Sequence, residues 1–581
     1  MYFPRLSVCV LLVLGFPRLS AAQWSTDPAA NLSIREDPSH QIVSLATPDG
    51  TGGLITLWVQ GFEDSDLYAQ RVDARGYRQW GPEGVPVAAA PRIQYPEAIV
   101  PDGHGGAIVL WMDYRHHPGP IDFDATTNSL WVQRIDSTGQ RCWGPEGVPL
   151  RTDTAGWYHH PTLGEMLVPD GRGGGYIAWK ASYRDSTGEQ HYSTFVQYVD
   201  PIGQPQWGEG GTILQPEGWS GRVYGIPDGQ GGFYINSQGY LYRLQPEGSS
   251  TDFVPLHIVE IAPDLSVGFV VPAPRDGVFY VGFTREHSQV TGIRVLRFTA
   301  TGHLRWSAHI PEAEGAFRCS LQAVPDGTGG VLVSWGDQHS TASWAQRVDS
   351  AGTVRWAAPV AYQGNGGESC DPVTGYRSTL IAATGAGGGY VPRTVETDSA
   401  YRRVVQRIGP DGVTVWPGGG TTFITRQQEP QSPYGKMRAY CLGDGGVVYV
   451  WPELNQTTKY YDVNVQYIGK TGVLGLPDTK LGRPTSPRDS NELKLKVFPN
   501  PFNKSVTITF STESVSPTRI SIVSIQGTTV DEWTEFPPGP GFHQTQWTGT
   551  TYSGKAVSAG IYYCVVRQGD RMGKRKIVFL K

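Results

Sequence analysis

The sequence predicts an all-β protein in which an eight-bladed β-propeller is followed by a small β-sandwich. The 581 residues include 74 Gly and 44 Pro, and only 17% are charged. This composition is typical of many short strands joined by tight turns. Two short phrases recur in alternation along the chain, and a different strand pattern occupies its C-terminal end. We divide the chain into a signal peptide at 1–22, a propeller at 23–476, a linker at 477–492 and a sandwich at 493–581.

The N-terminal residues have the pattern of a secretory signal peptide. Residues 1–5 are short and basic, residues 6–16 are apolar but too short to span a bilayer, and Ser20-Ala21-Ala22 offers small residues for cleavage. Gln23 is then the expected first residue of the mature chain. Because no later segment approaches the roughly 18 apolar residues of a spanning helix, we expect no transmembrane segment.

The first recurring phrase is Pro-Asp-Gly-x-Gly-Gly, and a strand-like apolar run follows it. Pro presets φ, Asp accepts backbone N–H groups, and Gly adopts positive φ, so the phrase predicts a tight turn. Its Asp residues are expected to cap turns instead of acting as catalytic acids, because turns of successive units lie too far apart for a glycosidase pair. Five strong copies begin at Pro48, Pro101, Pro169, Pro227 and Pro325, and three weaker copies lie near Pro274, Gly385 and Gly443.

The second phrase is Asp-x-x-Gly with a Trp four residues after the Gly. Together the two phrases describe a four-stranded antiparallel unit, and such units repeated around an axis are propeller blades. The phrase resembles the tryptophan-docking repeat of eight-bladed quinoprotein and outer-membrane assembly propellers, which implies Trp side chains packed between blades. The resemblance carries over no enzymatic residue, and we expect no cofactor. The clearest docking positions are Trp80, Trp143, Trp207 and Trp356.

The order of the phrases also predicts how the units close into a ring. Trp24 stands where the fourth strand of a unit would begin, although no unit precedes it. The last unit has Leu476 where the others have Trp. We therefore expect residues 24–36 to complete the last blade, which makes eight.

Polar and aromatic residues gather in three loops that could form a binding rim. Aromatic rings could stack on a sugar or peptide while Arg and His donate hydrogen bonds to it, and the alternative is ordinary solvated loops. Adjacent His side chains point apart in a strand and no third ligand is indicated, so we expect no metal. Gly-x-Ser-x-Gly, HExxH and P-loop motifs are absent from the sequence, which leaves no candidate catalytic residue. The candidate ligand-binding residues are Tyr114, Arg115, His116, Tyr158, His159, Tyr183 and Arg184.

The C-terminal residues carry a set of motifs in a fixed order. The motif positions are Pro499, Asn500, Pro501, Trp547, Gly554, Gly560, Tyr562, Lys574 and Lys576. This pattern resembles the type A C-terminal sorting domain of the type IX secretion system, an immunoglobulin-like sandwich similar to the flagellar hook-capping fold. The family has Asp where this chain has Thr548 and Thr550. The resemblance implies recognition by the secretion machinery and removal near the linker, with attachment to surface lipopolysaccharide as one outcome.

These observations predict an extracellular or outer-membrane-surface protein that crosses the periplasm and binds or scaffolds a glycan or protein. The rival hypothesis is a secreted polysaccharide-active hydrolase or lyase with its site in the propeller mouth, and a third is a structural surface protein without a small ligand. We favour a non-enzyme. The net charge is −5 and no basic block precedes the last strand, so nucleic acid is not an expected partner.

Overall fold

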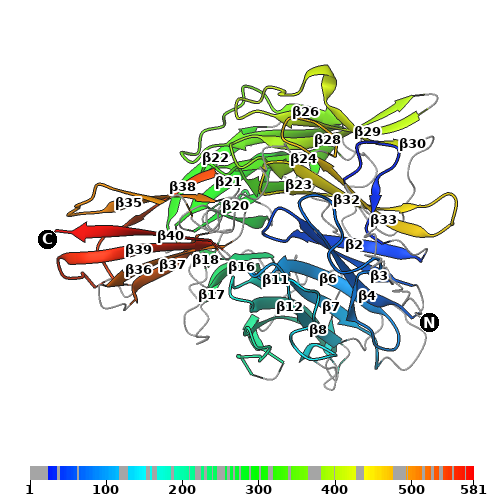
Figure 1. Cartoon of the computed structure of the whole chain (residues 1–581), viewed down its shortest axis with the longest axis horizontal. Coiled ribbons are helices and arrows are strands. Elements are labelled where there is room, and N and C mark those ends of the chain that lie inside the picture. The colour runs from blue at the N-terminus through cyan, green and yellow to red at the C-terminus, as the bar shows by residue number, and fades with distance from the viewer. Residues whose placement is uncertain are drawn as a thin grey trace, which may run out of the picture.

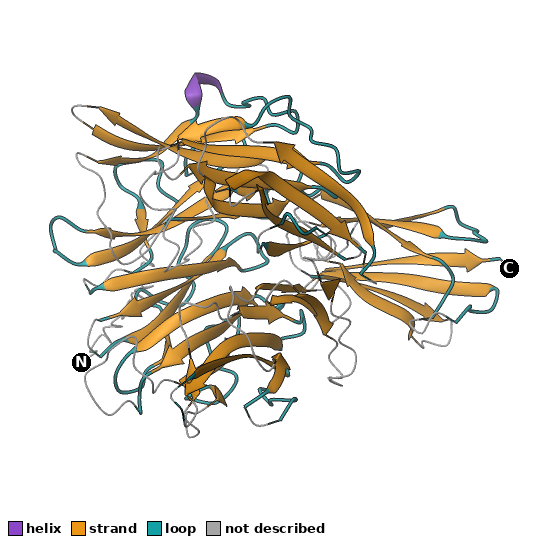
Figure 2. Ribbon diagram, turned by 180° about the vertical axis from the view of Figure 1, so that it is seen from behind, coloured by secondary structure: helices purple, strands orange, loops and turns teal. Residues whose placement is uncertain are grey.

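The computed structural model shows an almost entirely β protein (Figure 2). Among the described residues the helical element is one 3-10 turn, η2 (Pro417–Gly419), and no helix there has the length and hydropathy needed to span a bilayer. The structure describes residues 24–580 with the exception of 36–38, 62–63, 117–128, 152–156, 160–165, 185–186, 188, 209, 216–223, 228–231, 238–239, 245–255, 258–261, 266–267, 274–276, 287–288, 300–301, 312–317, 338–341, 364–380, 398–399, 427–436, 476–492, 494, 513–516, 525–528, 536–540, 552–554 and 569–570.

Between residues 32 and 468 the described strands form eight antiparallel sheets. The first four sheets are β2 (Gln41–Pro48), β3 (Leu54–Gln60), β4 (Asp66–Val72) and β5 (Val85–Ala88); β6 (Gln94–Pro101), β7 (Ala107–Asp113), β8 (Ser129–Ile135) and β9 (Val148–Arg151); β10 (Trp157–His159), β11 (Met166–Pro169), β12 (Gly175–Arg184), β13 (Gln190–Val199) and β14 (Thr212–Gln215); β15 (Tyr224–Pro227), β16 (Phe233–Ser237), β17 (Tyr240–Leu244) and β18 (Leu256–His257).

The next four sheets follow the same order along the chain. They are β19 (Phe269–Pro272), β20 (Val278–Glu286), β21 (Gln289–Phe298) and β22 (Leu304–Pro311); β23 (Arg318–Pro325), β24 (Val331–Asp337), β25 (Ala342–Val348) and β26 (Val360–Gln363); β27 (Ala382–Ala383), β28 (Gly389–Thr397), β29 (Ala400–Ile408) and β30 (Thr421–Arg426); β31 (Arg438–Cys441), β32 (Val447–Leu454), β33 (Tyr461–Ile468) and β1 (Leu32–Ser33).

One strand of each of the eight sheets contacts the corresponding strand of the next sheet along the chain. β2 contacts β6, β6 contacts β11, and the contacts continue through β15, β19, β23 and β27 to β31, which returns to β2. Figure 1 shows the sheets fanning outward, with the strands of residues 495–579 (orange to red) beside them.

The N-terminal segment supplies the outer strand of the last sheet. β1 pairs with β33, with Leu32 opposite Val465. Trp24 is buried and its indole donates to the Ala74 carbonyl of the first sheet at 2.9 Å. Gln466 of β33 donates to the carbonyl of Ser25 at 2.7 Å. Strands from both ends of this region therefore share one sheet.

The Pro-Asp-Gly phrase builds its turn through the Asp side chain. Asp49 accepts hydrogen bonds from the N–H groups of Thr51 and Gly53 at 2.7 and 2.8 Å, and its second oxygen accepts from Arg71 Nε at 2.9 Å. A Cβ at Gly53 would lie 2.3 Å from the Val72 carbonyl, so no larger residue fits. Asp102 and Asp326 repeat these contacts, and Asp228 lies outside the described residues. Asp170 accepts from the N–H groups of Arg172 and Gly174 in the same way, with the Tyr198 hydroxyl as its second donor in place of an Arg. The interpretation of these Asp residues as turn caps is confirmed at those four turns.

The second phrase locks neighbouring sheets together. Trp80 Nε1 and Arg71 Nη1 both donate to the Ser137 carbonyl in the turn of the next sheet, each at 3.1 Å. The Trp80 ring covers Gly139 of that turn, where a Cβ would lie 3.0 Å from the ring. We call the accepting group the docking carbonyl. The same pair of donors reaches one carbonyl in three further cases: Trp143 and Arg134 at Pro201, Trp356 and Arg347 at Pro410, and Trp416 and Arg407 at Lys470.

Burial of the tryptophans follows the predicted pattern with one exception. Trp80, Trp143 and Trp356 are buried between sheets, but Trp207 is half-buried, and the turn at 245–248 that follows it lies outside the described residues. The tryptophans of the second strands are core residues, as expected: Trp58, Trp111, Trp179, Trp335 and Trp451.

Residues 493–580 form two further antiparallel sheets around one core. Apolar and polar residues alternate along β35, whose burial alternates in the same way, so one face lies inside. The smaller sheet is β34 (Leu495–Phe498), β35 (Val506–Thr512) and β38 (Gly541–Trp547), and the larger is β37 (Thr529–Glu535), β36 (Thr518–Ser524), β39 (Gly560–Gln568) and β40 (Arg571–Phe579).

Candidate functional site

The first predicted rim cluster follows the end of β7, and its three residues have different environments. Tyr114 is only 1% exposed, its N–H donates to the Ile93 carbonyl at 3.0 Å, and its ring packs in the core. The structure therefore corrects the prediction of a rim ring here, because burial of the aromatic side chain prevails over solvation of the loop. His116 is exposed. Arg115 lies between them in a polar cluster.

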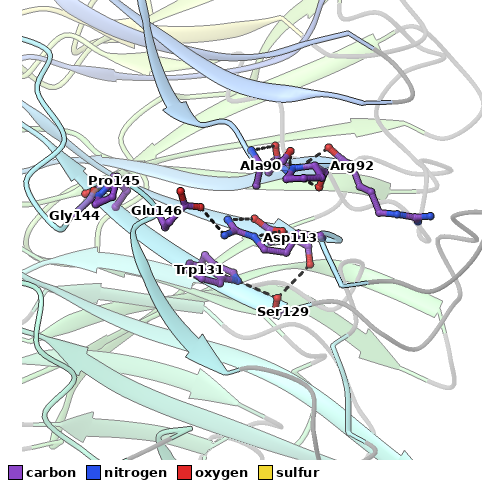
Figure 3. A network of polar contacts seen from close by, with 12 residues as sticks. Ala90, Arg92, Asp113, Ser129, Trp131, Gly144, Pro145 and Glu146 are labelled. Atoms are coloured by element: carbon purple, nitrogen blue, oxygen red, sulfur yellow. Dashed lines mark hydrogen bonds and ion pairs between the residues drawn. The ribbon is translucent and has the colours of Figure 1, made fainter.

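Arg115 is held by two carboxylates (Figure 3). Its Nε and Nη2 donate to the two oxygens of Asp113 at 2.9 and 2.8 Å, and its Nη1 donates to Glu146 at 2.8 Å. Asp113 is fully buried and also accepts from Trp111 Nε1 at 3.0 Å. The forked pairing fixes the guanidinium plane.

An aromatic ring completes the cluster. The guanidinium carbon of Arg115 lies 4.1 Å from the centre of the Trp131 ring, within the range of a cation–π contact. Trp131 Nε1 donates to Ser129 at 2.9 Å, and its ring stacks on Trp111. Because Asp113 and Trp131 are themselves held by Trp111 and Ser129, they restrict the movement of Arg115.

The electrostatics favour a permanent charge at Arg115. Burial lowers the pKa of this guanidinium, but the hydrogen bonds and charges of Asp113 and Glu146 outweigh burial and leave the pKa raised. Glu146 keeps 57% of its side chain exposed. The Glu146 carboxylate is therefore the one that solvent can reach, whereas the Asp113 carboxylate is buried against Arg115. The exposed His116 directly follows Arg115 in the sequence.

A related arrangement occurs in the first sheet. Arg35 lies over the Tyr68 ring at 5.5 Å, donates to Gln60, and lies 3.9 Å from Glu83. Glu83 and Glu146 occupy the same place in two copies of Trp-Gly-Pro-Glu-Gly-Val-Pro. That repeated heptapeptide is the signal from which Glu146 could have been found in the sequence. Because the heptapeptide recurs in two sheets, we infer that the Arg35 and Arg115 clusters stabilise these sheets in addition to any role in binding.

The other two predicted rim clusters come together on one sheet. Strand β10 pairs with the end of β12, with Tyr158 opposite Ser182 and His159 opposite Ala181. Tyr183 lies opposite Trp157, and Arg184 ends β12 opposite Gln190. The sequence suggested loops here, but the long β12–β13 hairpin extends the sheet by an extra strand. Within the described part of the chain, no group of three His, Cys, Asp or Glu residues is placed to hold a metal ion.

In the C-terminal sheets the motif residues secure the last strand. Asn500 accepts a hydrogen bond from the N–H of Val578 and donates to the Lys576 carbonyl, at 2.8 and 2.7 Å. Pro499 and Pro501 flank it. Phe502 continues the contact, because its N–H donates to the Val578 carbonyl at 3.0 Å.

The remaining motif residues of the tail have separate places. Trp547 is buried against Phe502 and Phe579. The Tyr562 hydroxyl donates to the Ser558 carbonyl at 2.7 Å, and Gly560 begins β39. Lys574 and Lys576 are exposed on β40, and Gly554 lies outside the described residues.

Comparisons with known proteins find remote structural likenesses. A Dyadobacter fermentans protein of unknown function is 12% identical, with 67% of this chain and 97% of that chain covered and a TM-score of 0.28. PorZ, described as a surface component of the type IX secretion system of Porphyromonas gingivalis, is 10% identical over 96% and 100% of the chains, with a TM-score of 0.21. An ulvan lyase is 10% identical over 77% and 96%, with a TM-score of 0.35. Scores this low carry no functional argument.

A search of curated proteins finds no match. A family model described as a secretion system C-terminal sorting domain matches residues 496–580. The match agrees with the motif set predicted in this region and covers the two C-terminal sheets. It indicates that this chain carries a tail for export by the type IX secretion system to the cell surface or extracellular space.

Proposed function

We propose that this is a secreted or cell-surface binding or scaffold protein, built as an eight-bladed β-propeller with a removable sorting domain. The observation that carries the proposal is the sorting-domain match at 496–580, which follows a region of repeated β-sheets. Residues 1–22 act as the signal peptide, 23–476 as the propeller, 477–492 as the linker and 493–581 as the immunoglobulin-like sorting domain.

The eight-bladed ring is supported by the contacts between sheets. Eight strands, one from each sheet, contact one another in a closed order, and the β1–β33 pairing joins the two ends of the region. Trp24 and Gln466 repeat the contacts that Trp80 and Gln70 make in the first unit. The N-terminal strand therefore completes the last blade.

The acidic side chains of the repeats bind other groups within the protein, which supports a binding role for the surface instead of a catalytic one. Asp49, Asp102 and Asp326 hold turn N–H groups and an Arg, and Asp113 holds Arg115. Such a rigid scaffold suits recognition by surface side chains with little ordering cost. The proposed ligand-contacting residues are Arg115, His116, Tyr158, His159, Tyr183 and Arg184, with a glycan or a protein as the ligand.

The export role is tested by removing residues 493–581 from the full-length gene in a bacterium that has a type IX secretion system. The truncated protein is expected to accumulate, folded, in the periplasm, and the intact protein to reach the surface or medium without its tail. Lipopolysaccharide attachment would appear as a ladder of higher mass. Normal delivery of the truncated protein would refute the sorting role.

The binding role is tested with the mature exported protein on arrays of glycans and polysaccharides, scored for retention and for released products. Saturable binding without product supports the proposal, and substitution of His116 with Ala is expected to weaken that binding. Release of oligosaccharides would instead establish the rival hydrolase or lyase function.

A further inference from the structure

The outer face of the larger C-terminal sheet is basic. Outward and inward side chains alternate along β39, as its burial shows, and β40 pairs with it in the same register, although Arg575 is exposed as well as Lys574 and Lys576. Cross-strand pairs place Tyr563 opposite Lys576, Val565 opposite Lys574, and Arg567 opposite Arg519 of β36. We call the surface formed by Arg519, Tyr563, Arg567, Lys574 and Lys576 the basic face.

Two of the four cations of the basic face, Lys574 and Arg519, contact neighbouring side chains. Lys574 Nζ lies 4.3 Å from the centre of the Tyr563 ring, in a cation–π contact. Arg519 lies 3.9 Å from Glu532, which also accepts from Ser521 at 2.7 Å. Among the described outward positions of these strands, Glu532 is the acidic residue, against four cations.

This arrangement costs the tail stability. Like charges directly opposite each other on a sheet repel, and Arg519 and Arg567 are direct cross-strand partners. Ile561 and Met572 are 40% and 42% exposed on the same face, which is unfavourable in water. A partner that places carboxylates over the face would relieve this repulsion and bury both apolar side chains.

The net positive charge is found in the tail, residues 493–581, and not in the rest of the chain. Residues 493–581 contain eleven Lys and Arg but five Asp and Glu, a formal charge of +6, whereas the whole chain carries −5, which leaves −11 on residues 1–492. A surface that attracts anionic partners is therefore confined to the segment that the sorting-domain model matches.

We propose that the basic face docks against an acidic protein surface of the export machinery. This inference rests on the proposed export function and names the part of the tail that the export machinery would contact. A protein fits better than an anionic lipid surface, because the Glu532 carboxylate lies on the same face as the cations and a uniformly anionic surface would repel it. Carboxylates placed opposite the four cations would give the docking its orientation.

The test uses the full chain in a bacterium with a type IX secretion system. The double substitution Lys574→Glu with Lys576→Glu is expected to lower the amount at the surface at least about tenfold, with the protein retained in the periplasm. The matched control is Lys504→Glu with Lys555→Glu, which makes the same charge change at exposed positions off the face. Export of the control at the normal level is expected, and an equal loss there would overturn the proposal. Equal melting temperatures of the purified variants exclude misfolding.

A photo-crosslinking amino acid at Ile561 identifies what covers the face in living cells. The expected result is one envelope protein whose crosslink disappears in the Lys574→Glu, Lys576→Glu variant, and whose own acid-to-lysine substitution restores export of that variant. Crosslinks to lipopolysaccharide, to phospholipid or to residues 24–475 of the same chain would overturn the proposal.

The two hypotheses fail in different ways. If the chain lacking 493–581 is exported normally, the sorting role itself is refuted. If that truncation is retained but the Lys574→Glu, Lys576→Glu variant is exported normally, the sorting role stands and the docking face lies elsewhere on the tail.

Discussion

Replacement of Trp356 tests how strongly one docking tryptophan joins two sheets. Its side chain is 3% exposed, and its indole donates to the docking carbonyl of Pro410 at 3.1 Å. The ring covers Gly412, where a Cβ would lie 2.7 Å from it. Arg347 donates to the same carbonyl at 3.1 Å. Trp356→Ala therefore removes the ring and one of two donors, while the acceptor keeps a partner.

The expected loss can be worked out from these contacts. A buried Trp covers about 150–250 Å², and about 25 cal/mol per Å² gives roughly 4–6 kcal/mol as an upper estimate. Large-to-small changes at such sites cost about 3–5 kcal/mol, which we expect for Trp356→Ala. Trp356→Phe keeps most of the area and loses the indole N–H, so about 1 kcal/mol is expected.

Gly412→Ala tests the contact between this glycine and the Trp356 ring. This Gly has φ +84°, so an Ala there is strained as well as in contact with the ring. In the Trp356→Ala background the contact disappears and only the backbone strain remains. The second substitution should therefore cost less in the variant than in the parent protein.

Denaturant unfolding followed by circular dichroism gives the free energies, and hydrogen exchange of residues 409–412 reports local opening. The local measurement matters because a chain of many units need not unfold in two states. If Trp356→Ala costs no more than Trp356→Phe and exchange at 409–412 is unchanged, the ring does not join the sheets and the docking interpretation is wrong.

Three further outcomes are expected. Deletion of residues 23–36 should lower the free energy of unfolding by several kcal/mol, since it exposes the edge of β33 and the site of Trp24; an unchanged melting curve would argue against closure by this segment. Asn500→Ala should cost about 0.5–1.5 kcal/mol, because its hydrogen bonds are exposed, and should speed exchange of the Val578 amide, which loses its acceptor; equal exchange rates would dismiss the role of Asn500 as a clamp on β40. Burial lowers the pKa of Lys180 to about 8, so the unfolded chain binds the proton more tightly and stability from this group rises with pH between about 8 and 10.5. The stability gain of Lys180→Met should therefore shrink across that range, and a constant difference would contradict the lowered pKa.

Local chemistry explains which features the sequence could predict. The turn at Asp49 and the burial of Trp80 follow from residues within one phrase, so the phrase itself carries the information. The all-β content and the C-terminal motif set were predicted for the same reason, and the family match at 496–580 confirms the latter.

Features that depend on distant residues were not predictable in this way. Arg115 was expected on an open rim, but its partner Glu146 lies 31 residues further on and its aromatic contact comes from another strand. Tyr114 was expected at the same rim and is buried, because packing in the core decided its side chain. β10 and the end of β12 were taken as loops, since short polar-aromatic segments carry no strand period of their own.

The position of β1 has a mechanical consequence. The described chain leaves the last sheet beyond Leu474, beside Ser25, so tension from a C-terminal attachment enters through β33. Without β1, this strand would be the outer edge of its sheet, and a pulling force could peel it away one hydrogen bond at a time. With β1 on one side and β32 on the other, the same force must shear two ladders together. The N-terminal strand thus strengthens the hold of the repeated sheets on the strand next to the point of attachment.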